Sequence, residues 1–182
     1  LGNRFLSHIR EVDAVLHVVR CFENDDVTHV DGSINSVRDS ETINFELLFA
    51  DIETIEKRLI RSEKFIKTGD KKYLFECDTL KIVKEALGSG IFASAVELDD
   101  AQRELVDSLF LLTAKPVLYA ANIADTDAAD PYAQPHVQSL MRLADKQNAE
   151  VLVLCARLEE ELWALPLDER GAFLDELGIK QS

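Results

Sequence analysis

The residues best suited to chemistry stand at the ends of two short apolar stretches in the second half of the chain, "KPVLYAANI" (115–123) and "AEVLVLCA" (149–156). They are Asn122, Ile123, Ala124, Asp125, Cys155 and Ala156. An amide can join two loops, a carboxylate can accept from ring N–H groups, and backbone groups can read the edge of a purine. The same residues are typical of strands that end in turns, because Asn and Asp side chains bond the local backbone. Spacing alone leaves both interpretations open.

Other kinds of site have no support in the sequence. Phosphate binding needs a Gly-rich loop with a Lys and a Ser or Thr, whereas "GSG" at 88–90 has no Lys and lies in a helical region. The four histidines are dispersed, with no zinc spacing, and we interpret His17 as a core histidine. We interpret Cys21 and Cys155 as small buried hydrophobes. We therefore expect neither a catalytic residue nor a metal site within this chain.

The composition narrows the classes of partner. The 182 residues carry a formal net charge of −14, and 47% of them are apolar. This acidic balance argues against a chain that binds DNA through its own basic surface. No apolar run is long enough to cross a membrane, and three scattered cysteines predict a cytoplasmic protein with reduced thiols. The chain begins without Met, so we expect a fragment of a longer protein.

Three apolar stretches predict a parallel sheet that positions the candidate residues. Residues 12–22, 115–123 and 149–156 are short and almost continuously apolar, as strands buried on both faces are. Between the last two strands, residues 130–148 predict a helix whose apolar side chains recur at helical spacing. These side chains are Val137, Leu140, Met141 and Ala144. A strand, a helix and a strand with short connections predict a parallel crossover unit.

The middle of the chain predicts helices instead of strands. A heptad pattern with Ser62 in one slot predicts a long helix, and its apolar members are Phe45, Leu48, Ile52, Ile55, Leu59 and Ile66. A break at 68–70, with Gly69 suited to a helix end, precedes a second helix over 71–87. One face of that helix carries Tyr73, Cys77, Leu80 and Leu87. The two helices predict an antiparallel hairpin.

Two shorter helices complete the predicted order of elements. Asp99 and Gln102 predict a capping box at the start of a third helix over 99–112. A last amphipathic helix over 167–179 would stop at Gly178. The fold class is therefore α/β with a helical insertion. We divide the chain into a first α/β segment (1–38), an inserted helical coiled-coil domain (39–110) and a second α/β segment with the C-terminal helix (111–182).

Several long stretches resemble one family. "GNRFLSHIRE", "HVVRCFENDD", "HVDG", "INFELLFADIETIEKR", "LLTAKPVLYAANIAD" and "DERGAFLDELGI" are similar, in this order, to the YchF/Obg-like ATPases of the translation-factor-related P-loop GTPase class. The resemblance implies a Ras-like P-loop nucleotide-binding domain with a helical coiled-coil insertion. It also implies that the phosphate-binding loop precedes Leu1 and that a TGS domain follows Ser182, so the chain resembles a central fragment.

The resemblance further implies ATP hydrolysis coupled to ribosome association, with Mg²⁺ held by residues outside this chain and the fragment alone inactive. Guanine readers of the class carry Asn-Lys-x-Asp, and the YchF-like branch carries Asn-x-x-Glu. Asn122–Asp125 lacks the Lys, as in that branch, but keeps the Asp of guanine readers. The family's Ser-Ala loop falls on Cys155–Ala156.

We favour adenine, read by backbone groups around Ile123, because adenine lacks the pair of N–H donors that an Asp binds in guanine. GTP binding is the first alternative. The second is a helical hairpin that docks a protein partner without turnover, motivated by the charged stretch "EKRLIRSEKFIK".

Overall fold

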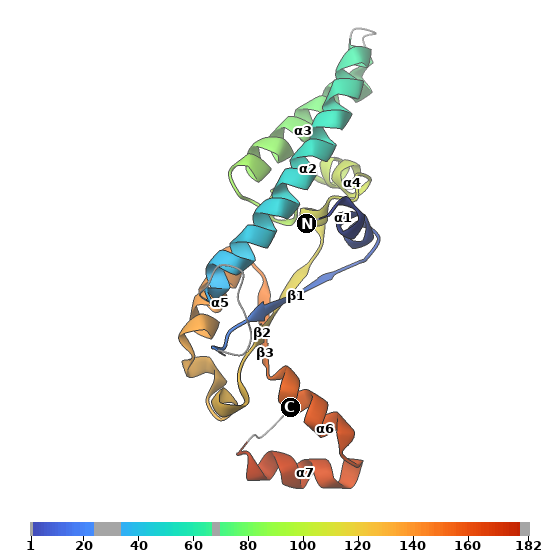
Figure 1. Cartoon of the computed structure of the whole chain (residues 1–182). Helices are drawn as coiled ribbons and strands as arrows, with labels where there is room; N and C mark the ends of the chain where they lie inside the picture. The colour runs from blue at the N-terminus through green and yellow to red at the C-terminus, as the bar shows by residue number, and fades with distance from the viewer. Residues whose placement is uncertain (1, 24–33, 67–69, 179–182) are drawn as a thin grey trace. The chain divides into compact units, whose positions relative to one another are not determined.

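A computed structural model describes residues 2–23, 34–66 and 70–178. The chain forms two compact units, one made of Leu1–Val15 with Glu41–Pro116 and the other of Leu16–Ser40 with Val117–Ser182. Both are visible in Figure 1. The "HVDG" stretch and Gly69 lie outside the described residues. Within the described ranges, no helix is both long enough and apolar enough to span a membrane.

The first unit is helical, and we call it the helical unit. Its main helices are α1 (Asn3–Arg10), α2 (Ser36–Ile66), α3 (Lys71–Gly88) and α4 (Asp100–Asp107). Two short 3₁₀ helices are η1 (Ala93–Ala95) and η2 (Leu112–Ala114). The first residues of α2 belong to the other unit. Figure 1 shows α2 and α3 side by side as a hairpin, as the sequence predicts.

The buried face of the hairpin differs in part from the predicted heptad pattern. Leu48, Ile55, Leu59 and Ser62 of α2 are buried as expected, but Phe45 is 52% exposed, so its assignment to the seam is wrong. The buried stripe instead includes Asn44, Leu47 and Asp51. A straight helix drifts from a strict seven-residue repeat, and polar residues can enter the stripe where they have partners. On α3, the predicted Cys77, Leu80 and Leu87 are buried and Tyr73 is half-buried.

Helix α4 begins as predicted and ends earlier. The Asp99 carboxylate accepts from the Gln102 N–H at 2.8 Å, and the Gln102 side chain accepts from the Asp99 N–H at 3.1 Å, which confirms the capping box. The helix stops at Asp107 instead of residue 112. Phe110 then takes a left-handed φ of 51°, which turns the chain away from the helix axis.

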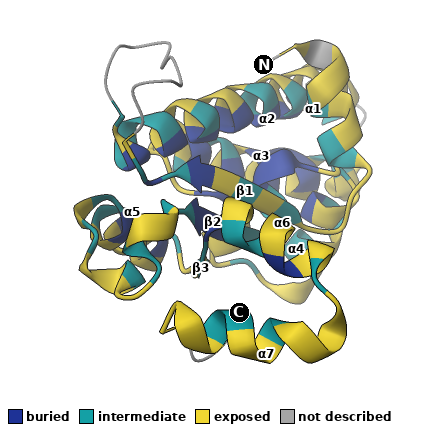
Figure 2. Cartoon of the chain, turned by 60° about the horizontal axis from the view of Figure 1, so that its bottom comes forward, coloured by how far each residue is buried: buried dark blue, intermediate teal, exposed yellow. Residues whose placement is uncertain are grey.

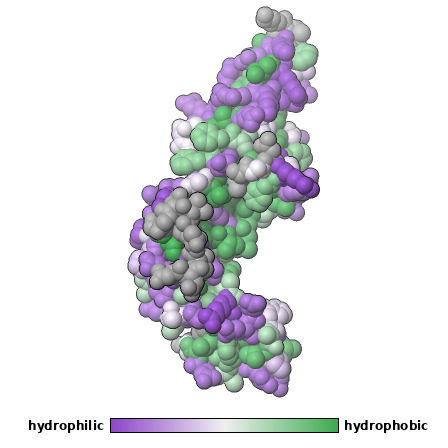
Figure 3. Space-filling view, viewed as in Figure 1, coloured by the Kyte–Doolittle hydropathy of each residue, from purple (hydrophilic) through white to green (hydrophobic). Residues whose placement is uncertain are grey.

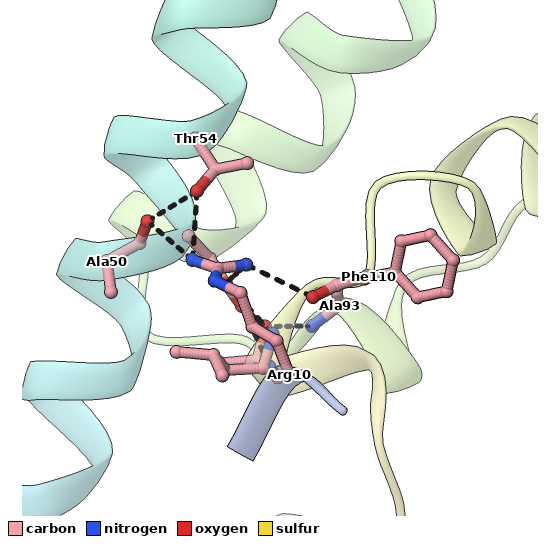
Figure 4. Close-up of polar contacts among 8 residues, drawn as sticks. Arg10, Ala50, Thr54, Ala93 and Phe110 are labelled. Atoms are coloured by element: carbon pink, nitrogen blue, oxygen red, sulfur yellow. Dashed lines mark hydrogen bonds and ion pairs between the residues drawn. The ribbon is translucent and has the colours of Figure 1, made fainter. Parts of the chain in front are cut away.

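After this turn, the backbone donates hydrogen bonds to a buried carboxylate. Asp51, which is fully buried, accepts from the Leu112 and Thr113 N–H groups at 2.9 and 2.7 Å. Arg10 of α1 lies 3.6 Å from Asp51 and donates to the Phe110 carbonyl at 3.1 Å. Figure 4 shows this network around Arg10, between α1, α2 and the segment that carries Phe110. It ties three distant parts of the sequence into the helical unit.

The second unit contains a three-stranded sheet, and we call it the α/β unit. The strand order is β1 (Val15–Arg20), β2 (Val117–Asn122) and β3 (Glu150–Leu154). Strands β2 and β3 are parallel, and Asn122 pairs with Leu154 at their carboxyl ends. The helices are α5 (Pro135–Lys146), α6 (Ala156–Ala164) and α7 (Leu167–Glu176). Two 3₁₀ helices, η3 (Asp125–Asp127) and η4 (Pro131–Ala133), precede α5.

Helix α5 supplies the core of this unit and begins later than predicted. It starts at Pro135 because a proline fixes the first turn of a helix and disfavours helical backbone in the residue before it. Val137, Leu140 and Ala144 pack with Tyr119 of β2 as expected. Met141 is 37% exposed, so its place in the core is corrected, and Leu143 is buried instead.

The prediction that the strands are buried on both faces is confirmed for the middle of β2, where Tyr119, Ala120 and Ala121 are all buried, and is wrong for β1 and β3. Leu16 and Val18 of β1 are 58% and 61% exposed, and Leu152 of β3 is 48% exposed. These residues alternate with the core-facing ones, as the two faces of a strand require. Helix α5 covers only the face that carries Val19 and Tyr119. Figure 2 shows exposed colour along part of β1, where exposed residues alternate with half-buried ones before Val19.

Candidate functional site

Asn122 joins three elements at the carboxyl ends of the strands. Its side-chain oxygen accepts from the Ala156 N–H at 2.9 Å, which connects the end of β2 to the first residue of α6. Its backbone carbonyl accepts from the Cys21 N–H at 2.8 Å, just after β1. The parallel register of β2 and β3 brings the two loops to one edge of the sheet. Asn122 and Ala156, both predicted site residues, are therefore in direct contact.

The backbone at Ile123 differs from the expectation. Its side chain is 4% exposed and lies in the core, and its N–H donates to the Leu154 carbonyl at 2.9 Å. That N–H is therefore not available for a ring nitrogen of adenine, so this detail of the prediction is corrected. Ala124 follows with extended backbone, and its carbonyl accepts from the Asp127 N–H at 3.2 Å. The loop is consequently fixed by its own hydrogen bonds.

Both carboxylate oxygens of Asp125 have partners. One oxygen lies 3.2 Å from the Arg157 guanidinium, and the other accepts from the Thr126 N–H at 2.9 Å. Arg157 also contacts Glu161 at 3.2 Å. The Asp125–Arg157 pair lies on the surface, where such pairs contribute roughly 0–1 kcal/mol. The sequence places Arg157 at the end of the second strand, beside Cys155 and Ala156, but its pairing with Asp125 was missed, although opposite charges directly after neighbouring strands are a usable signal.

Cys155 and Ala156 lie where β3 gives way to α6, a helix that was also missed. Cys155 is 7% exposed with extended backbone, and Ala156 begins the helix. Leu158 and Leu162, four residues apart before Pro166, are the signal that could have indicated it. The three cysteines are free and buried, and burial raises the pKa of the Cys21 thiol to about 12. The interpretation of Cys21 and Cys155 as buried hydrophobes is confirmed.

Two hollows border the loop. One, of about 310 Å³, is lined by polar and apolar residues that include Cys21, Ala124, Thr126 and His136. The other, of about 110 Å³, is mainly apolar and is lined by Ile123, Cys155 and residues of α6 and α7. Asp125 lines neither of them. In the part of the chain that the structure describes, no three His, Cys, Asp or Glu side chains gather as a metal site would require.

Histidine and glycine positions agree with structural roles. The His17 ring lies 5.2 Å from the Tyr119 ring, and burial lowers its pKa. Gly178 follows α7 with a φ of 70°, which matches the predicted helix stop.

Comparisons with known proteins give a consistent result. No protein-family model matches the chain. It is 48% identical over 182 residues to the ribosome-binding ATPase YchF of Bacillus subtilis (strain 168) and 36% identical over 181 residues to that of Escherichia coli O157:H7. These matches cover 100% of the chain and 50% and 49% of the two relatives. The chain spans about half the length of the curated relatives it matches.

A solved structure shares the fold. The Schizosaccharomyces pombe YchF GTPase matches with a TM-score of 0.87 and 28% sequence identity, and the match covers 100% of this chain and 50% of that one. The expected α/β fold is confirmed. The sequence matches, which extend over the whole chain, confirm the family resemblance for this half of those proteins.

Proposed function

Since the chain is homologous over its whole length to one half of the YchF proteins, we propose that it carries the purine-recognition loop of a ribosome-associated, ATP-hydrolysing protein. The site residues are Asn122, Ile123, Ala124, Asp125, Cys155 and Ala156. The loop binds the base, while phosphates and Mg²⁺ are held by residues of the complete protein outside this chain. The proposed association with ribosomes would place the complete protein in the cytoplasm.

The hydrogen bond between Asn122 and Ala156 is the observation that carries this proposal. A base-binding pocket made of two loops needs the loops at a fixed separation, because a misplaced donor or acceptor loses most of its hydrogen-bond energy. The Asn122 side chain supplies that connection, and its carbonyl ties the same point to β1. A turn that only reversed the chain would not need a side chain that joins β2 to α6.

The contacts of Asp125 favour ATP over GTP. Guanine is recognised by a carboxylate that accepts from two neighbouring N–H groups, whereas adenine does not offer that pair. Arg157 and the Thr126 N–H each occupy one oxygen of Asp125. The carboxylate would have to share or give up these partners to accept from both N–H groups of guanine. Adenine would be read by the carbonyl of Ile123 and by backbone N–H groups of the neighbouring loop.

Catalysis by nucleotide hydrolases of this class consists of positioning and charge stabilisation around the phosphates. This chain supplies the base pocket and the sheet, so the pure 182-residue chain should release no phosphate from ATP or GTP above the buffer rate. The complete protein that contains it should hydrolyse ATP under the same conditions. Turnover by the isolated chain would show that catalytic groups lie within these residues.

The helical hairpin supports a second candidate function, that of a docking module for a large partner. Helices α2 and α3 form a hairpin whose outer faces carry charged side chains together with exposed apolar ones such as Phe49, Ile60 and Leu74. Such a role is compatible with ATP binding by the complete protein. Removal of the hairpin from the complete protein tests it, because binding to ribosomes that survives the deletion would exclude the hairpin as the docking element.

A further inference from the structure

The turn between α6 and α7 exposes the single tryptophan of the chain. Trp163, in the last turn of α6, is 72% exposed, and Leu167 at the start of α7 is 81% exposed. Tryptophan side chains are highly buried on average. The apolar hollow beside the loop is instead lined by other side chains of these helices, among them Leu162 and Phe173. Packing within the α/β unit therefore does not account for a tryptophan at this position.

Arg170 of α7 holds the indole ring in one orientation. Its guanidinium lies over the Trp163 ring, 4.8 Å from the ring centroid, and donates to the carbonyls of Leu165 and Trp163 at 3.1 and 3.4 Å. The guanidinium covers one face of the ring, and the high exposure of Trp163 leaves the opposite face open to solvent. Because the ring is already fixed, it loses little conformational freedom when a partner binds. The open face is thus a preformed contact surface.

The two helices that carry this ring are strongly acidic. Residues 156–178 contain seven Asp and Glu residues and only two basic residues. Both basic residues are occupied, Arg157 by Asp125 and Glu161, and Arg170 by the Trp163 ring. Figure 3 shows hydrophilic side chains gathered at the lower end of the view, where Figure 1 places α6 and α7. Six carboxylates here have no hydrogen-bond or ion-pair partner among the described residues, and they are Glu159, Glu160, Asp168, Glu169, Asp175 and Glu176.

Helix stability accounts for only some of these charges. Acidic side chains are favoured near the N-terminus of a helix and disfavoured near its C-terminus. Asp168 and Glu169 lie in the first turn of α7, where they stabilise the helix. Asp175 and Glu176 lie in its last turn, which holds no basic residue. Two carboxylates at the less favourable end of a helix indicate a requirement other than folding.

The ring and the carboxylates both favour a cationic partner. Indole is the best cation–π acceptor among the aromatic side chains, so the open face of Trp163 can take a second guanidinium or ammonium group. Asp168 and Asp175, two turns apart on one face of α7, offer carboxylates to further cations. Leu167 can contact the apolar stem of a Lys or Arg side chain. We propose that Trp163, Leu167, Asp168 and Asp175, which we call the acidic corner, bind a lysine- and arginine-rich segment of a protein partner.

Binding of a synthetic peptide to the complete protein tests this surface. The probe is a fluorescein-labelled peptide of Arg, Leu and Ala, about 15 residues long so that it can form a helix. Its control is the same peptide with every Arg replaced by Glu. Fluorescence anisotropy measures the affinity of each peptide. Trp163→Ala is compared with Phe49→Ala, which removes another exposed aromatic side chain from a helix. The double variant Asp168→Asn/Asp175→Asn is compared with Asp100→Asn/Asp107→Asn, which changes the same residue type at the same spacing on exposed positions of α4.

We expect the Arg peptide to bind and the Glu peptide not to bind. Trp163→Ala should weaken binding of the Arg peptide about tenfold through the lost cation–π contact, and Asp168→Asn/Asp175→Asn should weaken it roughly fivefold. Trp163→Phe keeps a ring face and should restore part of the affinity, which separates the role of the ring from any effect on folding. Both control variants should bind normally. Unchanged binding by the two corner variants, or equal binding of the Glu peptide, would overturn the proposal.

Two further outcomes would identify a different occupant. The 182-residue chain has one tryptophan, so its emission reports on the acidic corner directly. If the Arg peptide shifts this emission but does not bind the complete protein, the rest of the complete protein covers the corner and the proposal is wrong. If a peptide with Gln in place of every Arg binds the complete protein as tightly as the Arg peptide, the contact is apolar and the assignment of a cationic partner is wrong.

Discussion

The side-chain oxygen of Asn122 lies 2.9 Å from the backbone nitrogen of Ala156, and the hydrogen bond between them joins the ends of two parallel strands. Thirty-four residues separate the two positions in the sequence. The bond fixes the distance between the loop that follows β2 and the start of α6. The proposed purine site depends on this separation.

Replacement of Asn122 by Ala should weaken ATP binding by the complete protein by about tenfold. This factor corresponds to the loss of about 1.4 kcal/mol, the free energy that one hydrogen bond contributes. The loss arises because the loop and the start of α6 are no longer held together. Gln138→Ala, at an exposed amide on α5, is the matched control and should bind ATP normally. Titration calorimetry measures both, and equal affinities would remove Asn122 from the site.

Replacement of Arg157 by Ala should shift the preference of the complete protein toward GTP. The change frees one oxygen of Asp125, and a surface ion pair of up to about 1 kcal/mol corresponds to a shift of up to roughly fivefold in the ratio of affinities. Glu161→Gln removes the other partner of Arg157 and leaves the Asp125 pair intact. It should not change the ratio. A ratio unaffected by Arg157→Ala would mean that Asp125 does not take part in base selection.

Asp51→Asn should lower the free energy of unfolding of the 182-residue chain by about 2–4 kcal/mol, because two buried N–H groups share a carboxylate that an amide cannot replace. The Leu112 and Thr113 N–H groups each need an acceptor, and Asn offers only one oxygen. Urea unfolding measures the change. Glu85→Gln, on the exposed face of α3, is the control. A loss below about 0.5 kcal/mol, the scale of ordinary surface substitutions, would show that Asp51 is not needed as the anchor of η2.

Glu76 should make the free energy of unfolding of the chain depend on pH in the acidic range. The hydrogen bond from Arg58 lowers the pKa of Glu76 in the folded state, and the hydroxyl of Ser62 acts in the same direction. The unfolded state therefore binds more protons in the acidic range. Stability from this group is fully present above the ordinary pKa of a glutamate and is lost as the pH falls through the folded-state pKa.

The comparison of Glu76→Gln with the unmodified chain measures this effect. Urea unfolding at a series of pH values should give a difference in free energy of unfolding that is largest near neutrality and shrinks in acid. A difference that stays constant over the whole series would contradict the role of the Glu76 charge.

Local sequence patterns predicted the elements that depend on local chemistry. The capping box of α4, the stop at Gly178 and the helical hairpin follow from side chains within a few residues of one another. The buried stripe of α2 was harder to predict, because Asp51 is buried through bonds to residues about 60 positions away. No heptad pattern contains that information, and an exposed Phe45 fits the pattern as well as a buried one.

The site was predicted in its residues but not in its contacts. Asn122 and Ala156 could be named from two strand ends, because parallel strands place their carboxyl ends at one edge of a sheet. The partner of Asp125 was not predicted, since Arg157 follows a different strand and lies in a helix that was missed. The Ile123 N–H was assigned to a base, but it completes the pairing of β2 with β3.

The central claim is that the loop around Asn122 selects adenine. Calorimetric titration of the nucleotide-free complete protein with ATP and with GTP, in the same buffer with Mg²⁺, tests it most directly. We predict that ATP binds at least tenfold more tightly than GTP and that Asn122→Ala weakens this binding. Equal affinities, or tighter binding of GTP, would contradict the assignment.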